Sequence, residues 1–178
     1  MAVVYSTYTK SASLAKANIR YIQHRRGKDG EKLTRQLFGF EGNIAKTDAY
    51  TMIDAAPDGT YFYRISFNPD LLQEDGSRDL DLRTLTRDTL RALEEHLGRP
   101  LAFVAAVHAD HTERRHVNLL ALLPSRLNRA ELTALRNTLT QEATDQRREL
   151  DRQREREQEQ TREESSSRKA PERERTRL

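Results

Sequence analysis

Apolar residues recur at helical spacing, every three to four positions, in two segments of the chain. One segment covers residues 11–26, with Ser11 as a suitable N-cap. The other covers residues 80–97 and is closed by Gly98. A third run of leucines, over residues 125–139, has the same spacing. The pattern predicts three amphipathic helices.

Strand patterns fill the segments between these helices. Residues 60–67 alternate apolar and polar side chains, whereas residues 101–107 and 117–123 are continuous apolar runs of the kind seen in strands buried on both faces. A short strand is also expected at residues 3–5. The polar stretch 109–115 joins the two apolar runs, which indicates an antiparallel hairpin. The order predicts an α+β fold, an antiparallel sheet with helices packed on it.

The hydrophobic pattern ends near residue 145. The last 34 residues, 145–178, hold ten acidic, eleven basic and only four apolar residues. Such a segment cannot bury enough surface to offset its ordering entropy. We therefore divide the chain into a domain at residues 1–144 and a charged C-terminal tail, helical or disordered, whose removal is expected to change stability little. A role of the tail as a partner-binding or DNA-contacting arm is the alternative.

Composition narrows the class of protein. The 178 residues include 31 Lys and Arg against 28 Asp and Glu, and this small excess permits nucleic-acid binding without arguing for it. The absence of cysteine excludes disulfides and thiolate metal sites. No apolar run approaches the roughly 20 residues of a membrane helix, and the first ten residues lack a secretory signal. A soluble, cytoplasmic protein without a membrane partner is expected.

Histidines gather at the hairpin. His108 closes one apolar run and His116 opens the next, while His116 and Asn118 share a strand face because they are two residues apart. Imidazole nitrogens and an amide oxygen can together bind a divalent metal, and Asp110 is placed to orient an imidazole. His111 is an alternative third ligand. The simpler interpretation is that polar residues gather by chance in a hairpin loop.

This hairpin resembles the third motif of conjugative relaxases, the HUH-type mobilisation endonucleases, in which His-x-Asp precedes a short spacer and His-hydrophobic-His. Residues 17–22 are similar to the first relaxase motif, which carries a tyrosine, and residues 64–69 to the strand that ends in Ser before a proline. The resemblance covers about residues 11–124. Asn118 replaces the last histidine of the motif, and the spacer after Asp110 is about one residue longer.

The resemblance implies an HUH endonuclease-like sheet with a central metal-binding hairpin. It also implies a reaction in which Tyr21 attacks single-stranded DNA at a nick site, forming a 5′-phosphotyrosyl link and a free 3′-hydroxyl. His108, His116 and Asn118 would then bind Mg²⁺ or Mn²⁺, because an amide oxygen is a hard ligand, and Asp110 would assist catalysis. Accessory mobilisation proteins are the further partners expected in plasmid mobilisation or conjugation.

Alternatives exist for the nucleophile and for the function. Tyr5 and Tyr8 are rival nucleophiles, and Tyr21 can instead be a tyrosine packed at the edge of the core. The chain can also be a replication-initiator-type nickase, a non-catalytic single-stranded-DNA-binding accessory protein with a degenerate site, or a metal-stabilised interaction module.

Basic side chains near Tyr21 and near the hairpin are candidate contacts for the DNA backbone, which dominates the affinity of such complexes. The alternative is that the basic stretch after residue 23 only complements the dipole of its own helix. The candidate DNA-binding residues are His24, Arg25, Arg26, Lys28, Arg35, Arg114 and Arg115.

Overall fold

A computed structural model describes residues 1–110 and 114–168. Its elements are β1 (Val3–Thr9), α1 (Ala12–His24), α2 (Lys46–Asp54), β2 (Tyr61–Asn68), α3 (Leu82–Leu97), β3 (Ala102–His108), β4 (His116–Leu123) and α4 (Arg129–Arg168). The four strands form one sheet in the order β1-β2-β4-β3, and every neighbouring pair is antiparallel. The predicted α+β class with an antiparallel sheet is confirmed.

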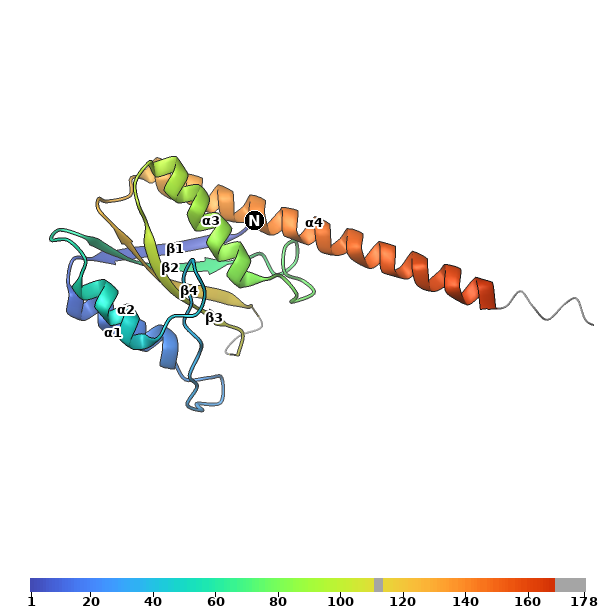
Figure 1. Ribbon diagram of the computed structural model, residues 1–178, viewed down its shortest axis with the longest axis horizontal. Coiled ribbons are helices and arrows are strands. Elements are labelled where there is room, and N and C mark those ends of the chain that lie inside the picture. The colour runs from blue at the N-terminus through green and yellow to red at the C-terminus, as the bar shows by residue number, and fades with distance from the viewer. Residues whose placement is uncertain (111–113, 169–178) are drawn as a thin grey trace, which may run out of the picture.

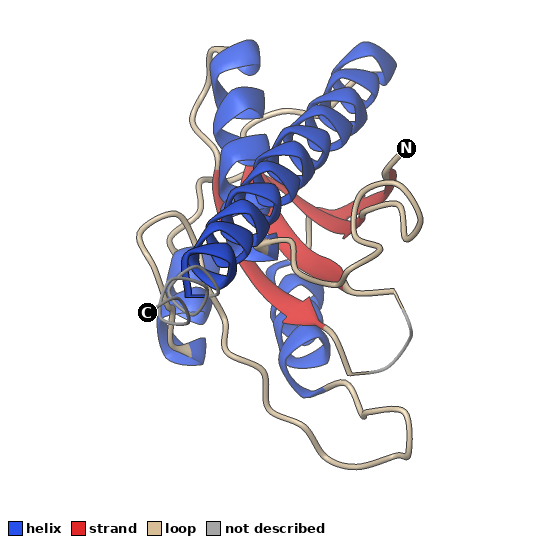
Figure 2. Ribbon diagram, turned by 90° about the vertical axis from the view of Figure 1, so that its right-hand side faces the viewer, coloured by secondary structure: helices blue, strands red, loops and turns tan. Residues whose placement is uncertain are grey.

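Helices cover both faces of the sheet, so the core has two halves (Figures 1 and 2). α1 and α2 pack on one face, where Ile19 and Ile22 contact apolar side chains of the inner strands. α3 and the first half of α4 pack on the other face and enclose a larger cluster that includes Leu90 and Leu135. The strands alternate their side chains between these two clusters, which explains the apolar runs of β3 and β4.

The β3–β4 hairpin is present as predicted, but it does not lie at the centre of the sheet. β4 is an inner strand, whereas β3 is the outer strand on that side. Phe38 covers the outer edge of β3 locally, because its backbone N–H and carbonyl both bond to Ala105 at 2.9 Å. β3 is therefore buried on both faces without having a full strand on each side.

Local capping explains where three helices begin or end. The side chain of Ser11 accepts a hydrogen bond from the backbone of Leu14 at the start of α1. Asp81 caps α3, and Gly98 ends it in the left-handed conformation that glycine adopts without strain. At the start of α4, Asn128 and Glu131 bond to each other's backbone N–H, a reciprocal capping arrangement.

α2 and most of β1 are not evident in the sequence pattern. α2 buries only Ala49 and Ile53 and has no side-chain N-cap, so its apolar stripe is two residues long. β1 is an outer strand with mostly exposed residues, and its Ser and Thr positions give little hydrophobic contrast. Both elements are held by contacts with the rest of the fold.

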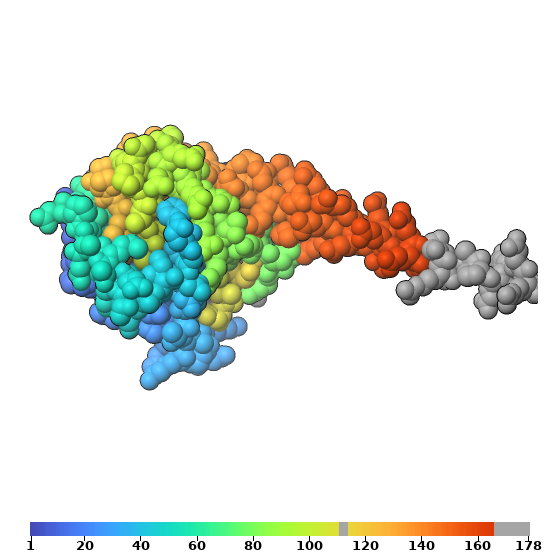
Figure 3. Space-filling model, viewed as in Figure 1, coloured from blue at the N-terminus to red at the C-terminus, as the bar shows by residue number. Residues whose placement is uncertain are grey.

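The expected boundary between domain and tail, near residue 145, falls within α4. α4 is one helix of 40 residues that crosses this boundary and projects from the body (Figures 1 and 3). Contacts with the body continue to Arg154: Arg147 and Arg154 both pair with Asp79, and Leu150 packs against the core. No helix in the described part of the chain is apolar enough to cross a membrane.

These contacts change the expected effect of truncation. Removing residues 145–178 should lower the melting temperature by about 3–8 °C, because it deletes the Arg147 and Arg154 ion pairs and the packing of Leu150. Removing only residues 155–178 should leave it unchanged, since the side chains of residues 155–165 are exposed. Thermal unfolding followed by circular dichroism measures both. Equal melting temperatures for the two truncations would show that α4 is not docked beyond residue 144.

Candidate functional site

One row of residues crosses the sheet on the α1 side. In the strand register, Tyr5 is opposite Ser66, Ser66 is opposite Asn118, and Asn118 is opposite Ala106. The side chains of this row therefore point to the same face. Asn118 is a polar side chain next to the apolar residues that β3 and β4 contribute to this face, among them Val104, Ala106 and Leu120.

The next row carries two histidines. His108 and His116 are register partners at the loop end of the hairpin, where β3 ends and β4 begins, and their rings stack with centroids 5.1 Å apart. His116 and Asn118 lie on one face of β4, as the spacing predicted. The hairpin thus brings the three residues proposed as metal ligands to one end of one sheet face.

His108 is fully buried and neutral. Burial first, and then the nearby charges of Arg35 and His116, lower the pKa of its imidazole to about 3, while Asp110 and the carbonyl of Ile22 oppose the shift. Neither ring nitrogen has a hydrogen-bond partner of good geometry among the described residues. Burying an imidazole without a well-aligned partner is costly, so a ligand that bonds to His108 would be stabilising.

A divalent metal fits this set of donors. Neutral imidazole is the form that binds metal, and the amide oxygen of Asn118 adds a hard ligand suited to Mg²⁺ or Mn²⁺. The Nδ1 atom of His116 lies 3.3 Å from the carbonyl oxygen of Arg114. Among the described residues, no three His, Asp or Glu side chains form a metal-binding group, so the candidate set depends on Asn118. His111, the alternative ligand, lies outside the described residues.

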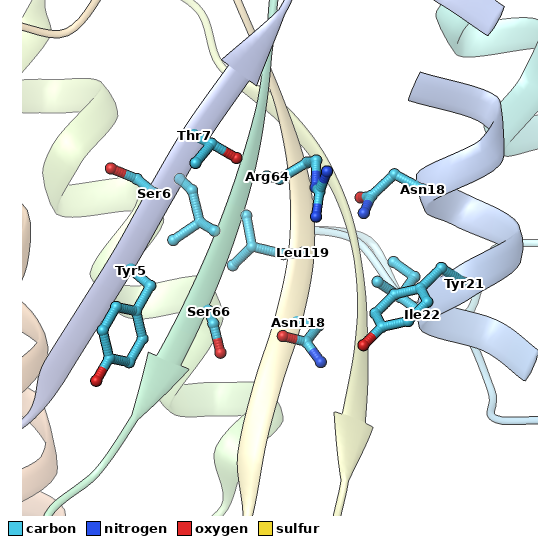
Figure 4. A pocket seen from close by; sticks show the side chains of 11 residues that line it. Tyr5, Ser6, Thr7, Asn18, Tyr21, Ile22, Arg64, Ser66, Asn118 and Leu119 are labelled. Carbon is cyan, nitrogen blue, oxygen red and sulfur yellow. The ribbon is translucent and has the colours of Figure 1, made fainter. Parts of the chain in front are cut away.

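Tyr21 faces one of the candidate ligands, Asn118, from α1. Its side chain is 48% exposed, and its hydroxyl points across a pocket of about 190 Å³ toward Asn118 (Figure 4). Ser66 lines the same pocket between Asn118 and β1. The guanidinium carbon of Arg25 lies 5.7 Å from the centre of the Tyr21 ring. α1 therefore presents a tyrosine hydroxyl, with a cation beside it, to the pocket that Asn118 lines on β4.

The pocket continues into a second hollow of about 580 Å³ along β1 and α1, and both are lined by Asn18, Tyr21 and Arg64. Arg64 points from β2 toward Asn18 on α1, and no hydrogen bond or ion pair involves its guanidinium among the described residues (Figure 4). The Oδ1 atom of Asn18 is also buried without a partner. The place of Arg64 beside Tyr21 was not predicted, because it depends on how α1 crosses the sheet.

The two rival tyrosines lie in different places. Tyr5 is 67% exposed on β1 and lines the same pocket as Tyr21, from the opposite wall. Tyr8 lies against Tyr61 and Tyr63, with ring centroids 5.3 Å apart in each pair. Tyr5 thus remains a geometric rival for Tyr21, whereas Tyr8 is turned away from Asn118 by its aromatic contacts.

Asp110 forms an ion pair with Arg35 and has no hydrogen bond to either candidate imidazole among the described residues. The Nε and Nη2 atoms of Arg35 lie 3.0 and 2.6 Å from the two carboxylate oxygens. Burial raises the pKa of Asp110, but the hydrogen bonds and charge of Arg35 outweigh this and hold the pKa below its usual value. The carboxylate is therefore ionised and holds Arg35, which differs from the predicted role of orienting a ligand.

The candidate DNA-binding residues divide into two groups. His24, Arg25, Arg26 and Lys28 lie at the end of α1 and just after it, on the side of the molecule that carries Tyr21. Arg35 and Arg115 are instead buried or nearly so, and each pairs with an aspartate, Asp110 and Asp75 respectively. Arg114 is exposed at the end of the hairpin.

The geometry therefore places the side chains of Tyr21, Asn118 and Arg64 around one hollow. The His108 and His116 pair lies further along the hairpin, outside the residues that line this hollow. The residues around the hollow can bind a phosphodiester and place a nucleophile next to it. No protein-family model matches this sequence, and no curated protein matches it either.

Proposed function

We propose that this chain is a metal-dependent DNA nickase that transfers a strand of single-stranded DNA to Tyr21. The observation that carries the proposal is the direction of the Tyr21 hydroxyl, which points from α1 toward Asn118, next to the His108 and His116 pair. The likeness of the hairpin to the third relaxase motif supports a role in plasmid mobilisation or conjugation. Accessory mobilisation proteins would then be its further partners.

The proposed reaction is a transesterification. The Oη atom of Tyr21 attacks the phosphorus, the bond from phosphorus to the 3′ oxygen breaks, and the phenolic proton ends in net balance on the released 3′-hydroxyl. The product is a 5′-phosphotyrosyl link, which conserves the energy of the phosphodiester for rejoining. Arg25 and Arg64 lie beside the nucleophile and on the pocket floor, where they can hold phosphate oxygens.

His108, His116 and Asn118 would hold the divalent ion, Mg²⁺ or Mn²⁺. When bound, the ion supplies positive charge that neutralises the oxygens of the reacting phosphate. The buried, neutral state of His108 keeps its nitrogens available for a ligand. Ser66 and Asn18 add polar atoms to the pocket wall, which can bond to the sugar or phosphate of the strand.

End-labelled DNA tests this proposal. A pool of random single-stranded oligonucleotides is labelled at the 3′ end or at the 5′ end, incubated with the protein and Mn²⁺, and separated on a denaturing gel. Label from the 3′-end pool alone should migrate with the protein, because the tyrosine keeps the fragment that starts with the 5′ phosphate. Label on the protein from neither pool, or from the 5′-end pool, would overturn the proposed reaction.

A non-catalytic single-stranded-DNA-binding protein is the second candidate. It is favoured by one observation: within the described residues, histidine supplies only two of the candidate ligands and Asn118 the third. In this case the oligonucleotide pool should bind, as measured by fluorescence anisotropy, with no label retained after denaturation. A replication-initiator-type nickase would give the same adduct as the first proposal and differ in the origin sequence that it cuts.

A further inference from the structure

Arg35 closes the C-terminal end of α1. Its backbone N–H donates to the carbonyl of Gln23 at 2.9 Å, and its Nη1 atom donates to the carbonyl of Arg25 at 2.7 Å. The last carbonyls of a helix have no partner within the helix, so these two bonds fix its final turn. That turn begins at Tyr21, whose carbonyl accepts from the backbone of Arg25.

The same guanidinium also holds the hairpin. Its two other nitrogens bond to both oxygens of Asp110, two residues after His108, and the side chain of Arg35 is only 6% exposed. A two-pronged contact between planar groups fixes direction as well as distance. The packing of Ile19 and Ile22 against the hairpin is apolar and therefore non-directional, and the carbonyl of Ile22 also acts on the imidazole of His108.

We propose that Arg35 is a positioning residue that sets Tyr21 against the candidate metal ligands by joining the end of α1 to Asp110. The inference rests on the proposed function, because it concerns the geometry of the same site. This role differs from contacting a DNA phosphate, since all three guanidinium nitrogens of Arg35 already form hydrogen bonds within the protein. Misplacing a reactive group by about 1 Å can slow a reaction roughly 100-fold, so a small movement of α1 is enough to matter.

Arg115 provides a matched control. Its Nε and Nη2 atoms bond to the two oxygens of Asp75 at 2.9 and 2.6 Å, and Nη2 also bonds to the carbonyl of Leu80 at 3.1 Å. The pair has the same two-pronged form, and its arginine and aspartate side chains are 16% and 3% exposed, against 6% and 33% in the Arg35 pair. It joins the hairpin to the loop before α3, however, and makes no bond to α1.

The first experiment compares Arg35→Gln with Arg115→Gln, with Arg35→Lys as a milder variant that keeps the charge but not the two-pronged contact. Melting temperature, affinity for the oligonucleotide pool and the rate of adduct formation at saturating DNA are measured for each. We expect Arg35→Gln to slow the adduct about 100-fold with little change in DNA affinity, and Arg35→Lys to slow it less. Arg115→Gln should lower the melting temperature similarly while slowing the adduct no more than a few-fold. Equal slowing in both glutamine variants, or a loss explained by DNA affinity alone, would overturn the proposal.

A second measurement does not depend on catalysis. The chain has no cysteine, so Arg20→Cys on α1 and Ala109→Cys after β3 can carry two spin labels without interference. Pulsed electron paramagnetic resonance measures the distribution of distances between the two labels. This distribution should be narrow in the otherwise unchanged protein and in Arg115→Gln, and broader or shifted in Arg35→Gln. An unchanged distribution in Arg35→Gln would refute the positioning role. Absence of any adduct in the unmodified protein would instead refute the proposed function, and the distances would still decide the role of Arg35.

Discussion

Replacing Tyr21 by phenylalanine is expected to abolish the covalent protein–DNA adduct while leaving the fold and the affinity for single-stranded DNA nearly intact. The substitution removes only the hydroxyl, and a phosphotyrosyl bond cannot form without it. The ring remains half-exposed on α1 with Arg25 beside it, so its packing does not change. The adduct is measured on a denaturing gel, and the affinity by anisotropy without Mn²⁺.

Tyr5→Phe is the matched control for this prediction, because Tyr5 lines the opposite wall of the same pocket. It should form the adduct at nearly the normal rate, and Tyr8→Phe should do the same, since Tyr8 packs on Tyr61 and Tyr63. An adduct that survives in Tyr21→Phe and disappears in Tyr5→Phe would assign the nucleophile to β1. The resemblance of residues 17–22 to a tyrosine motif would then be misleading.

The sequence predicts those parts of the fold in which a pattern of nearby residues directly determines the structure that they form. β2 was evident because apolar side chains, which face the core cluster under α3 and α4, alternate with more polar ones on the α1 side. α3 was evident because a stripe of leucines lies between Asp81 and Gly98. The pairing of His108 with His116 followed from a hairpin whose strands end at these residues. In each case, the residues that form the sequence pattern are also the residues that form the structural feature.

Contacts between distant segments could not be predicted in this way. Arg35 and Asp110 are 75 positions apart, and Arg115 and Asp75 are 40 apart, so nothing in the local pattern marks them as partners. In the sequence, Arg35 is one more cation in a basic stretch. Its burial depends on how the segment after α1 folds back against the hairpin, and only the folded structure contains that information.

The docked part of α4 extends beyond residue 145 for a related reason. The charged composition after residue 145 leaves a helical and a disordered tail open, and it does not reveal that Asp79 offers a partner to Arg147 and Arg154. The boundary between body and extension therefore lies near Arg154, ten residues later than the loss of apolar side chains suggests. Hydrophobic pattern identifies the core, whereas ion pairs can extend the docked part of a helix beyond it.

Changing Asn118 should have the second-largest effect on the proposed reaction, because the candidate metal set has only two imidazoles without it. Asn118→Ala is expected to weaken Mn²⁺ binding and to slow adduct formation by about 10–100-fold or more. Losing a residue that only hydrogen-bonds to a metal ligand typically has an effect of this size, so the loss of a ligand itself should cost at least as much. Asn118→His would complete a set of three imidazoles and should tighten the binding of Mn²⁺, Co²⁺ or Ni²⁺. Titration calorimetry with each metal measures both changes.

Ser66→Ala is the matched control for this series, since Ser66 is opposite Asn118 in the register and its side chain lines the same pocket. It should leave Mn²⁺ affinity unchanged, because its hydroxyl oxygen is already an acceptor for the side chain of Asn68 at 3.1 Å.

If His111 completes the site instead, His111→Ala will cause the loss of metal binding and Asn118→Ala will have no effect. If neither substitution matters and no divalent ion binds at all, the site is degenerate. Against that outcome, a metal bound to one nitrogen of the buried His108 imidazole would offset part of the cost of burying this ring without a well-aligned partner.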